Sequence, residues 1–189
     1  MNARRSVTAA LLLISNGASA ANDLAYDPQR PLYTSDQRAY SAAEVPLALN
    51  TLSGVDKTTI LFIHGRGDEP SKSLRPKKSM FGLGAAVPML ERQYGATVLM
   101  FNKAASQNDR ARPLSHMAEA AASLRDVIQQ MRAYYTANPS TRRAVLLAHS
   151  MGTIVVQRYV ERYGWNEGER LFSNVLFTGA DADNVDHAN

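Results

Sequence analysis

Apolar residues gather along the chain in short uninterrupted runs, separated by longer stretches of helical periodicity. An apolar run without alternation is typical of a strand buried on both faces of a parallel sheet. Four such runs predict strands over residues 58–63, 96–101, 144–148 and 174–178. Apolar positions spaced by three and four predict helices over residues 83–94, 114–135 and 151–163. This alternation predicts an α/β fold, with a doubly wound parallel sheet and helices on its faces.

The segment before the first predicted strand has a different pattern. Residues 21–57 are mostly polar and are interrupted by Pro28, Pro31 and Pro46. Proline fixes part of the backbone and removes a hydrogen-bond donor, so this pattern predicts loop with one short strand at most. We therefore expect a loop-rich lead-in over residues 21–57, followed by the folded core over residues 58–189.

Residues 1–20 contain the three parts of a secretory signal peptide in the right order. Arg4 and Arg5 supply a positive start, residues 7–14 are apolar, and a final Ala-Ser-Ala matches an A-x-A cleavage site. The apolar run is too short to span a membrane, which takes about 20 residues. The pattern predicts cleavage after Ala20, export to the periplasm or outside of a bacterial cell, and no transmembrane segment. A short N-terminal helix packed on the domain is the alternative.

Composition narrows the classes of function. The chain has 189 residues, 45% of them hydrophobic, which suits one globular domain and is too few for two. The formal net charge is +4 and falls to +2 without Arg4 and Arg5, a surplus too small to favour nucleic-acid binding. The absence of cysteine excludes disulfides, thiolate metal sites and a cysteine nucleophile. The four histidines lack metal-ligand spacing, and there is no phosphate-binding loop or dinucleotide motif, so we expect neither metal nor cofactor.

The candidate nucleophile is Ser150, in the stretch Ala148-His149-Ser150-Met151-Gly152. This stretch lies where a predicted strand meets a predicted helix, so we expect the serine on a sharp turn. Such a turn brings strand and helix nearly into contact, and it requires small residues two positions before and after the serine. Ala148 and Gly152 meet that requirement. The alternative is an ordinary helix N-cap, in which the serine accepts a backbone hydrogen bond and His149 is a surface residue.

The stretch resembles the G-x-S-x-G nucleophile elbow of the α/β-hydrolases, with Ala148 in place of the first glycine. The resemblance implies that the turn raises the hydroxyl of Ser150 above the sheet. It also implies that the backbone N–H of Met151, at the N-terminus of a helix, faces a developing oxyanion.

A second motif supports the same resemblance. The first predicted strand runs into His64-Gly65-Arg66-Gly67, and an H-G motif at this place in α/β-hydrolases supplies the other oxyanion N–H. Carried over, the donor is the backbone of Arg66 or a close neighbour, because glycine lets adjacent amides converge on one anion. We expect His64 to support the turn through hydrogen bonds rather than to act as the base. The resemblance covers about residues 58–180.

A serine hydrolase also needs a histidine base and an acid that orients it, and in α/β-hydrolases both follow the serine. After Ser150 the sequence has one histidine, His187, with Asp181 and Asp183 as candidate acids. Three interpretations stay open. The favoured one is a fragment whose C-terminal strands, acid and base are missing. In the second, residues 179–187 supply both groups, and in the third the protein is a non-catalytic relative.

Within the superfamily, the motifs are most similar to bacterial lipase- and esterase-like hydrolases. This resemblance implies an acyl-enzyme on Ser150 formed from a small-molecule ester or a lipid-like substrate. The rival expectation is a non-catalytic or vestigial protein that keeps the sheet. If the C-terminal strands are missing, residues 175–177 would form an unpaired apolar edge, which favours pairing with a partner or aggregation. The pattern predicts no particular oligomeric state.

Overall fold

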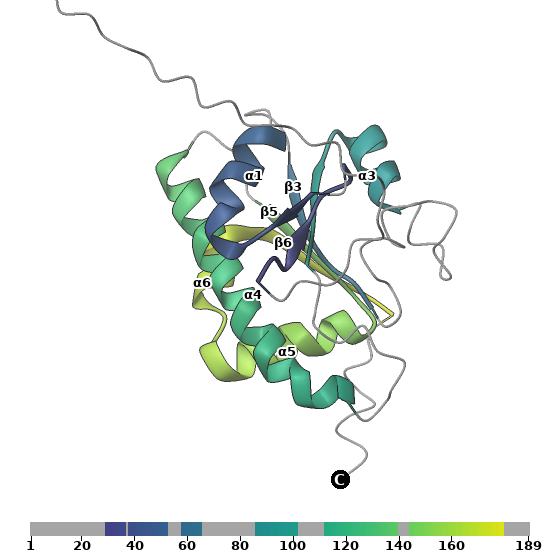
Figure 1. The fold of residues 1–189 in the computed structure, drawn as a ribbon, viewed down its shortest axis with the longest axis vertical. Coiled ribbons are helices and arrows are strands. Elements are labelled where there is room, and N and C mark those ends of the chain that lie inside the picture. Colours follow the sequence, from purple (N-terminus) through teal and green to yellow (C-terminus); the bar gives the residue numbers. More distant parts are fainter. Residues whose placement is uncertain are drawn as a thin grey trace, which may run out of the picture.

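The computed structural model describes residues 29–36, 38–52, 58–65, 86–101, 112–139 and 144–179. These residues form an α/β fold, one six-stranded sheet with helices packed on it (Figure 1). The strands are β1 (Leu32–Tyr33), β2 (Ala39–Tyr40), β3 (Thr59–Ile63), β4 (Thr97–Phe101), β5 (Ala144–His149) and β6 (Phe172–Thr178). The helices are the 3₁₀ turn η1 (Ala42–Glu44), α1 (Val45–Leu52), α3 (Ala86–Tyr94), α4 (Arg112–Ala137), α5 (Met151–Tyr163) and α6 (Asn166–Leu171).

The sheet is mostly parallel, in the order β2-β1-β4-β3-β5-β6. The four predicted strands are its parallel part, and Ile63 of β3 pairs with Phe101 of β4 and with Ala148 of β5. The carboxyl ends of these strands therefore reach the same edge of the sheet. The prediction of a fully parallel sheet is wrong for β1, which is antiparallel to β2 and to β4. A hairpin needs no crossover helix, so the lead-in can add these two strands directly.

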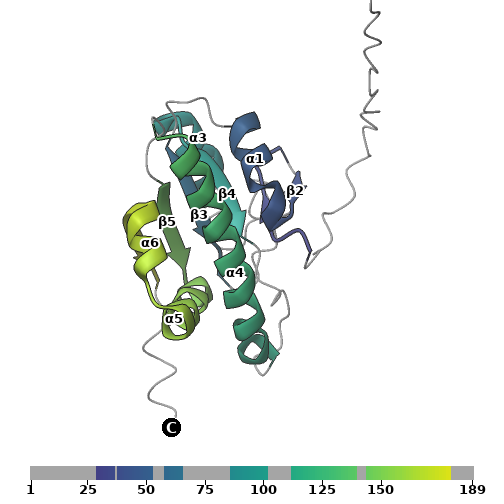
Figure 2. The ribbon, with the colours of Figure 1, turned by 90° about the vertical axis from the view of Figure 1, so that its left-hand side faces the viewer.

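Helices cover both faces of the sheet, as the alternation of elements predicts. Side chains of successive strand residues point to opposite faces. Leu61 and Ile63 of β3 therefore belong to the layer covered by α1, α4, α5 and α6, and Ile60 and Phe62 belong to the layer with Val87 of α3. Figure 1 shows α3 on one side of the sheet and α1, α4 and α6 on the other. Figure 2 shows α4 lying across the second face.

The described part of the lead-in, residues 29–36 and 38–52, belongs to the folded core, so the expectation of loop with one short strand at most is wrong there. Both residues of β1 are completely buried, and α1 occupies Val45–Leu52. The buried residues Val45, Ala48 and Leu49 have the spacing of one apolar helix face. Pro46 lies in the first turn of α1, where no backbone N–H is required, so it does not break the helix.

A carboxylate closes the turn before α1. Glu44 Oε2 accepts hydrogen bonds from the backbone N–H of Ser41 at 2.8 Å and from the Ser41 hydroxyl at 2.9 Å. The backbone bond is the main cause that lowers the pKa of Glu44 below its ordinary value, followed by the hydroxyl bond. Arg30, 3.3 Å from the same carboxylate, lowers this pKa further.

A short helix that the sequence analysis did not predict, α6, connects α5 to β6. Its sequence Asn-Glu-Gly-Glu-Arg-Leu is mostly polar and carries no apolar period. Aromatic packing holds this connection, because Trp165 is stacked on Phe172 with 6.0 Å between ring centroids and meets Tyr159 of α5 edge-on at 6.1 Å. A Cβ added to Gly168 would lie 2.7 Å from the indole, so this glycine makes room for Trp165.

The strand β6 forms one edge of the described sheet and exposes apolar side chains. Leu176 is 51% exposed and Phe177 is 54% exposed. The strand contains no proline and no charged residue, which are the usual protections of an edge. The apolar edge predicted at residues 175–177 is thus confirmed within the described part of the chain. None of the described helices combines the length and the apolar character needed to cross a membrane.

Candidate active site

Ser150 is the single residue that connects β5 to α5, as the sequence predicts. Its backbone has φ 49° and ψ −127°, and it is the only non-glycine residue with a positive φ among those the structure describes. A side chain in such a conformation costs about 1–3 kcal/mol and persists only where the surrounding structure holds it. The turn at Ser150 is therefore both sharp and strained.

Hydrogen bonds hold the backbone of Ser150 from both sides. Its N–H donates to the carbonyl of Thr178 in β6 at 3.0 Å. Its own carbonyl accepts from the backbone N–H of Thr153 at 2.8 Å and from the Thr153 hydroxyl at 2.7 Å. These bonds tie the turn to the neighbouring strand and to the first turn of α5.

The start of α5 touches the end of β3, which explains the small residue at position 152. A Cβ added to Gly152 would lie 2.3 Å from the carbonyl oxygen of Ile63 and 2.9 Å from that of His64. Both atoms belong to the backbone, so they cannot move aside as the end of a side chain can. Ala148, the other small residue of the motif, is completely buried.

The residues after β3 lie directly beside Ser150. A Cβ added to Gly65 would lie 3.0 Å from the Cβ of Ser150, so the close approach requires glycine. His64 is buried, and its Nδ1 lies 2.8 Å from the carbonyl oxygen of Gly65. This contact is the supporting role that the sequence analysis expected for His64.

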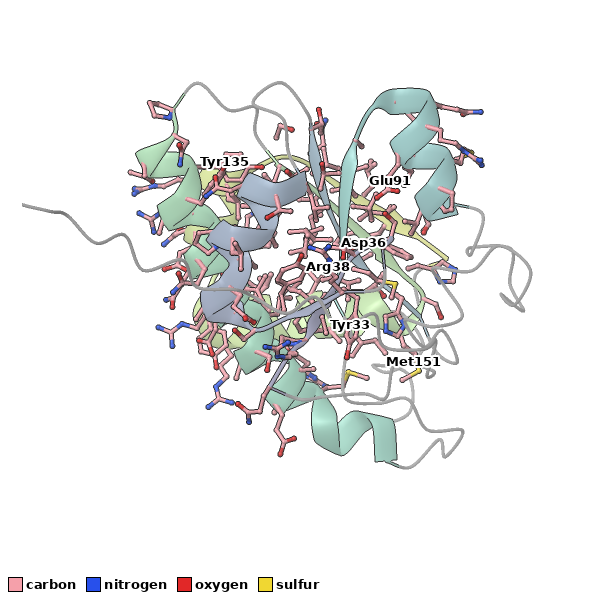
Figure 3. The ribbon with its side chains drawn as sticks, turned by 45° about the horizontal axis from the view of Figure 1, so that its top comes forward. Tyr33, Asp36, Arg38, Glu91, Tyr135 and Met151 are labelled. Atoms are coloured by element: carbon pink, nitrogen blue, oxygen red, sulfur yellow. The ribbon has the colours of Figure 1, made fainter. Side chains whose placement is uncertain are left out.

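Met151, the other expected oxyanion donor, is the first residue of α5. Its side chain is buried in the larger apolar layer, and this anchors the helix against the sheet. The backbone N–H groups of a first helical turn project from its N-terminal end, where the helix dipole is positive. Figure 3 shows Met151 and Tyr135, the latter near the C-terminal end of α4, at opposite ends of the molecule.

The N-cap interpretation of Ser150 does not match the described geometry. An N-cap serine accepts a hydrogen bond from the helix through its side chain, and Ser150 makes no such bond to α5. The first turn is instead closed on the carbonyl of Ser150 by Thr153. Ser150 is half-buried at this turn.

The remaining predicted site residues lie outside the described residues. These are the oxyanion donor Arg66, the candidate acids Asp181 and Asp183, and the candidate base His187. Within the described part of the chain, no group of three or more histidine, aspartate or glutamate side chains could hold a metal ion.

His149 packs more closely in the site than its sequence pattern predicts. It is half-buried, and its Nδ1 would lie 2.8 Å from a Cβ added to Gly65. On the other side, its Nε2 would lie 3.4 Å from a Cβ added to Gly179, the residue after β6. A glycine within two residues of the end of each neighbouring strand is the signal that could have indicated this packing.

No protein-family model matches the chain, and no curated protein matches it. The strained turn at Ser150 and the residues packed around it are the features that indicate a function.

Proposed function

We propose that this chain is a serine hydrolase of the α/β-hydrolase class, with Ser150 as its nucleophile. The observation that carries the proposal is the positive φ of Ser150 in a one-residue turn from a parallel strand into a helix. A nucleophile elbow has this strained turn because it lifts the serine hydroxyl clear of the sheet. An ordinary N-cap residue has extended backbone with a negative φ and bonds the helix through its side chain, and neither holds for Ser150.

The neighbourhood of β3 and β5 supports the same proposal. The two strands pair in parallel, and Gly65 after β3 approaches the Cβ of Ser150. An oxyanion hole needs two amides that converge beside the nucleophile, one from the residue after the serine and one from the loop after this neighbouring strand. We propose the backbone amides of Met151 and Arg66 for these two roles.

The proposed reaction is hydrolysis of an ester, from a small molecule or a lipid-like substrate. The Ser150 oxygen attacks the carbonyl carbon while a base takes the hydroxyl proton, and the carbonyl oxygen becomes an oxyanion held by the two amides. Collapse of this intermediate breaks the ester bond, and the alcohol leaves with the proton from the base. Water then attacks the acyl-enzyme, releases the carboxylic acid and restores Ser150.

The base and the location of the protein complete the proposal. The candidates that this sequence offers for the base and its acid are His187 with Asp181 or Asp183, which come after β6, and β6 pairs with the strand that carries Ser150. Loss of labelling in His187→Ala would assign the base to His187, and labelling at the parent rate would assign the base elsewhere.

We also propose export with residues 1–20 as the signal, so protein recovered from a bacterial periplasm should begin at Ala21 and not at Met1.

A fluorophosphonate probe tests the proposed nucleophile. The parent protein should be labelled at Ser150, as located by peptide mass spectrometry, and Ser150→Ala should abolish labelling. Ser173→Ala is the matched control, because Ser173 lies on the neighbouring strand and bonds the carbonyl of Ala144 at the opposite end of β5. We expect this control to be labelled at the parent rate.

The rival proposal, a non-catalytic protein with the same sheet, predicts a different result. A folded parent protein that takes up no probe and hydrolyses no ester would favour it. Equal labelling of the parent protein and Ser150→Ala would overturn the assignment of the nucleophile.

A further inference from the structure

The imidazole of His149 lies between two glycines that follow neighbouring strands. The edge formed by Nδ1 and Cε1 faces Gly65 after β3, at 2.8 Å and 3.4 Å from the position of an added Cβ. The edge formed by Nε2 and Cδ2 faces Gly179 after β6, at 3.4 Å and 3.6 Å from the corresponding position. The ring thus spans the carboxyl ends of β3 and β6, with β5 between them.

Gly65 contacts the ring and the proposed nucleophile at once. The same added Cβ would lie 3.0 Å from the Cβ of Ser150. The backbone at Gly65 is therefore packed against two consecutive residues, His149 and Ser150. A smaller side chain at position 149 would leave the backbone of Gly65 room to move relative to Ser150. Gly65 is also the residue directly before Arg66, the proposed oxyanion donor.

The ring holds this place by its volume rather than through a hydrogen bond at Nδ1. The Nδ1 atom is buried and has no hydrogen-bond partner within the described structure. A buried nitrogen without a partner lowers stability relative to an apolar group of the same shape, so stability alone does not explain a histidine here.

We infer that His149 is a positioning residue, whose imidazole sets the separation between the backbone of Gly65 and the side chain of Ser150. This inference rests on the proposed function, because the separation matters for the amide that follows Gly65. A shift of about 1 Å in such a group costs about 10²-fold in rate, while binding of the reagent is left unchanged.

Labelling kinetics test this role. In His149→Ala we expect the maximal rate of fluorophosphonate labelling to fall about 10²-fold, with the half-saturating probe concentration changed less than about twofold. Leu147→Ala is the matched control, since Leu147 is half-buried, two residues earlier on the same strand and on the same face. It should lower the unfolding midpoint and leave the labelling rate of the folded protein unchanged. Parent-like labelling of His149→Ala, or an equal fall in Leu147→Ala, would overturn the inference.

A double-mutant cycle tests the contact without any activity. Gly65→Ala should destabilise the parent protein, because its Cβ would meet Nδ1 of His149 and Cβ of Ser150. In the His149→Ala background one of these two obstacles is gone, so Gly65→Ala should cost less there. Gly95→Ala is the control, since a Cβ at Gly95 meets nothing within 4 Å, and its cost should be the same in both backgrounds. Equal costs of Gly65→Ala in both backgrounds would overturn the inference.

The two measurements separate the inference from the proposed function. A folded parent protein without labelling at Ser150 overturns the proposed function, and the cycle in unfolding free energy still decides whether His149 positions Gly65. A labelled parent protein with an additive cycle keeps the function and overturns the positioning role. If His149→Ala does not fold, His149→Val replaces it in both tests, because valine suits a strand and its side chain ends before the position of Nδ1.

Discussion

Ser150 and the two glycines that end α3 and α5 share a positive φ in very different surroundings. The φ angles are 60° at Gly95 and 74° at Gly164, and an added Cβ would meet nothing within 4 Å at either position. At the turn after β5, the residue with φ 49° keeps its side chain, and the crowded positions Gly65 and Gly152 are the glycines. Glycine thus relieves backbone strain at the helix ends, whereas around Ser150 it supplies space and the strain stays on the serine.

Gly152→Ala tests whether glycine supplies the space beside Ser150, and we expect it to have the largest effect. The new Cβ would meet the carbonyl oxygen of Ile63 at 2.3 Å, so β3 and α5 must separate. We expect a loss of about 3 kcal/mol or more in unfolding free energy, measured by denaturant titration. Gly95→Ala should cost only about 1–2 kcal/mol, because it adds strain at positive φ without a steric contact. Equal losses in the two variants would contradict the account of crowding at Gly152.

Ser150→Gly should relieve the strain at position 150, because glycine tolerates a positive φ. We expect the unfolding free energy of Ser150→Gly to be about 1–2 kcal/mol higher than that of Ser150→Ala. This difference includes the larger conformational entropy that glycine loses on folding. Both variants lack the hydroxyl, so neither should react with a fluorophosphonate. A Ser150→Ala protein as stable as Ser150→Gly would show that the backbone at this position is not strained.

Thr153→Val tests the bonds that hold the strained turn. It removes the hydroxyl that donates to the carbonyl of Ser150 at 2.7 Å. We expect a loss of about 1 kcal/mol and slower labelling of Ser150. Thr51→Val is the control, because the Thr51 hydroxyl makes the same kind of bond to the carbonyl of Leu47 on the exposed side of α1. The control should lose less stability and keep the parent labelling rate; slower labelling in it would contradict the role of Thr153.

Glu44→Gln changes the turn before α1, and we expect it to have the smallest effect on the unfolding free energy. The folded-state pKa of Glu44 is lowered, mainly by the backbone N–H of Ser41, so its contribution is present above the unfolded-state pKa. That contribution is lost as the pH falls through the lowered folded-state pKa. We expect Glu44→Gln to cost less than about 1 kcal/mol at neutral pH, because the carboxylate is partly exposed. In acid titrations of unfolding free energy, a difference from the parent protein that grows toward low pH would contradict this sign.

The sequence predicted the parallel part of the fold well because its signals are local. The apolar runs at β3, β4, β5 and β6 have no competing interpretation, and the small residue at Gly152 follows from the sharp turn. The helix α1 was missed because Pro46 suggests a break, although proline is tolerated in a first turn. The helix α6 was missed because its stability comes from Trp165 packing on Phe172 and Gly168, which are contacts that no periodicity encodes.

In the candidate site, too, features with a local signal could be predicted and contacts between strands could not. The sharp turn at Ser150 and the supporting contact of His64 could be predicted, because each depends on neighbours in sequence at the end of one strand. The packing of His149 against Gly65 and Gly179 joins three strands, and only the register of the sheet brings these residues together.

The stacking of Trp165 gives the chain an optical reporter of its own. Trp165 is the only tryptophan in the sequence, and its ring packs between Tyr159 of α5 and Phe172 of β6. Phe172 pairs with Ala144, the first residue of β5, so this packing lies at the end of β5 opposite Ser150. A change in indole emission therefore follows the loosening of the connection between α5 and β6 directly, so the wild-type chain needs no dye or engineered chromophore for its melting to be observed there.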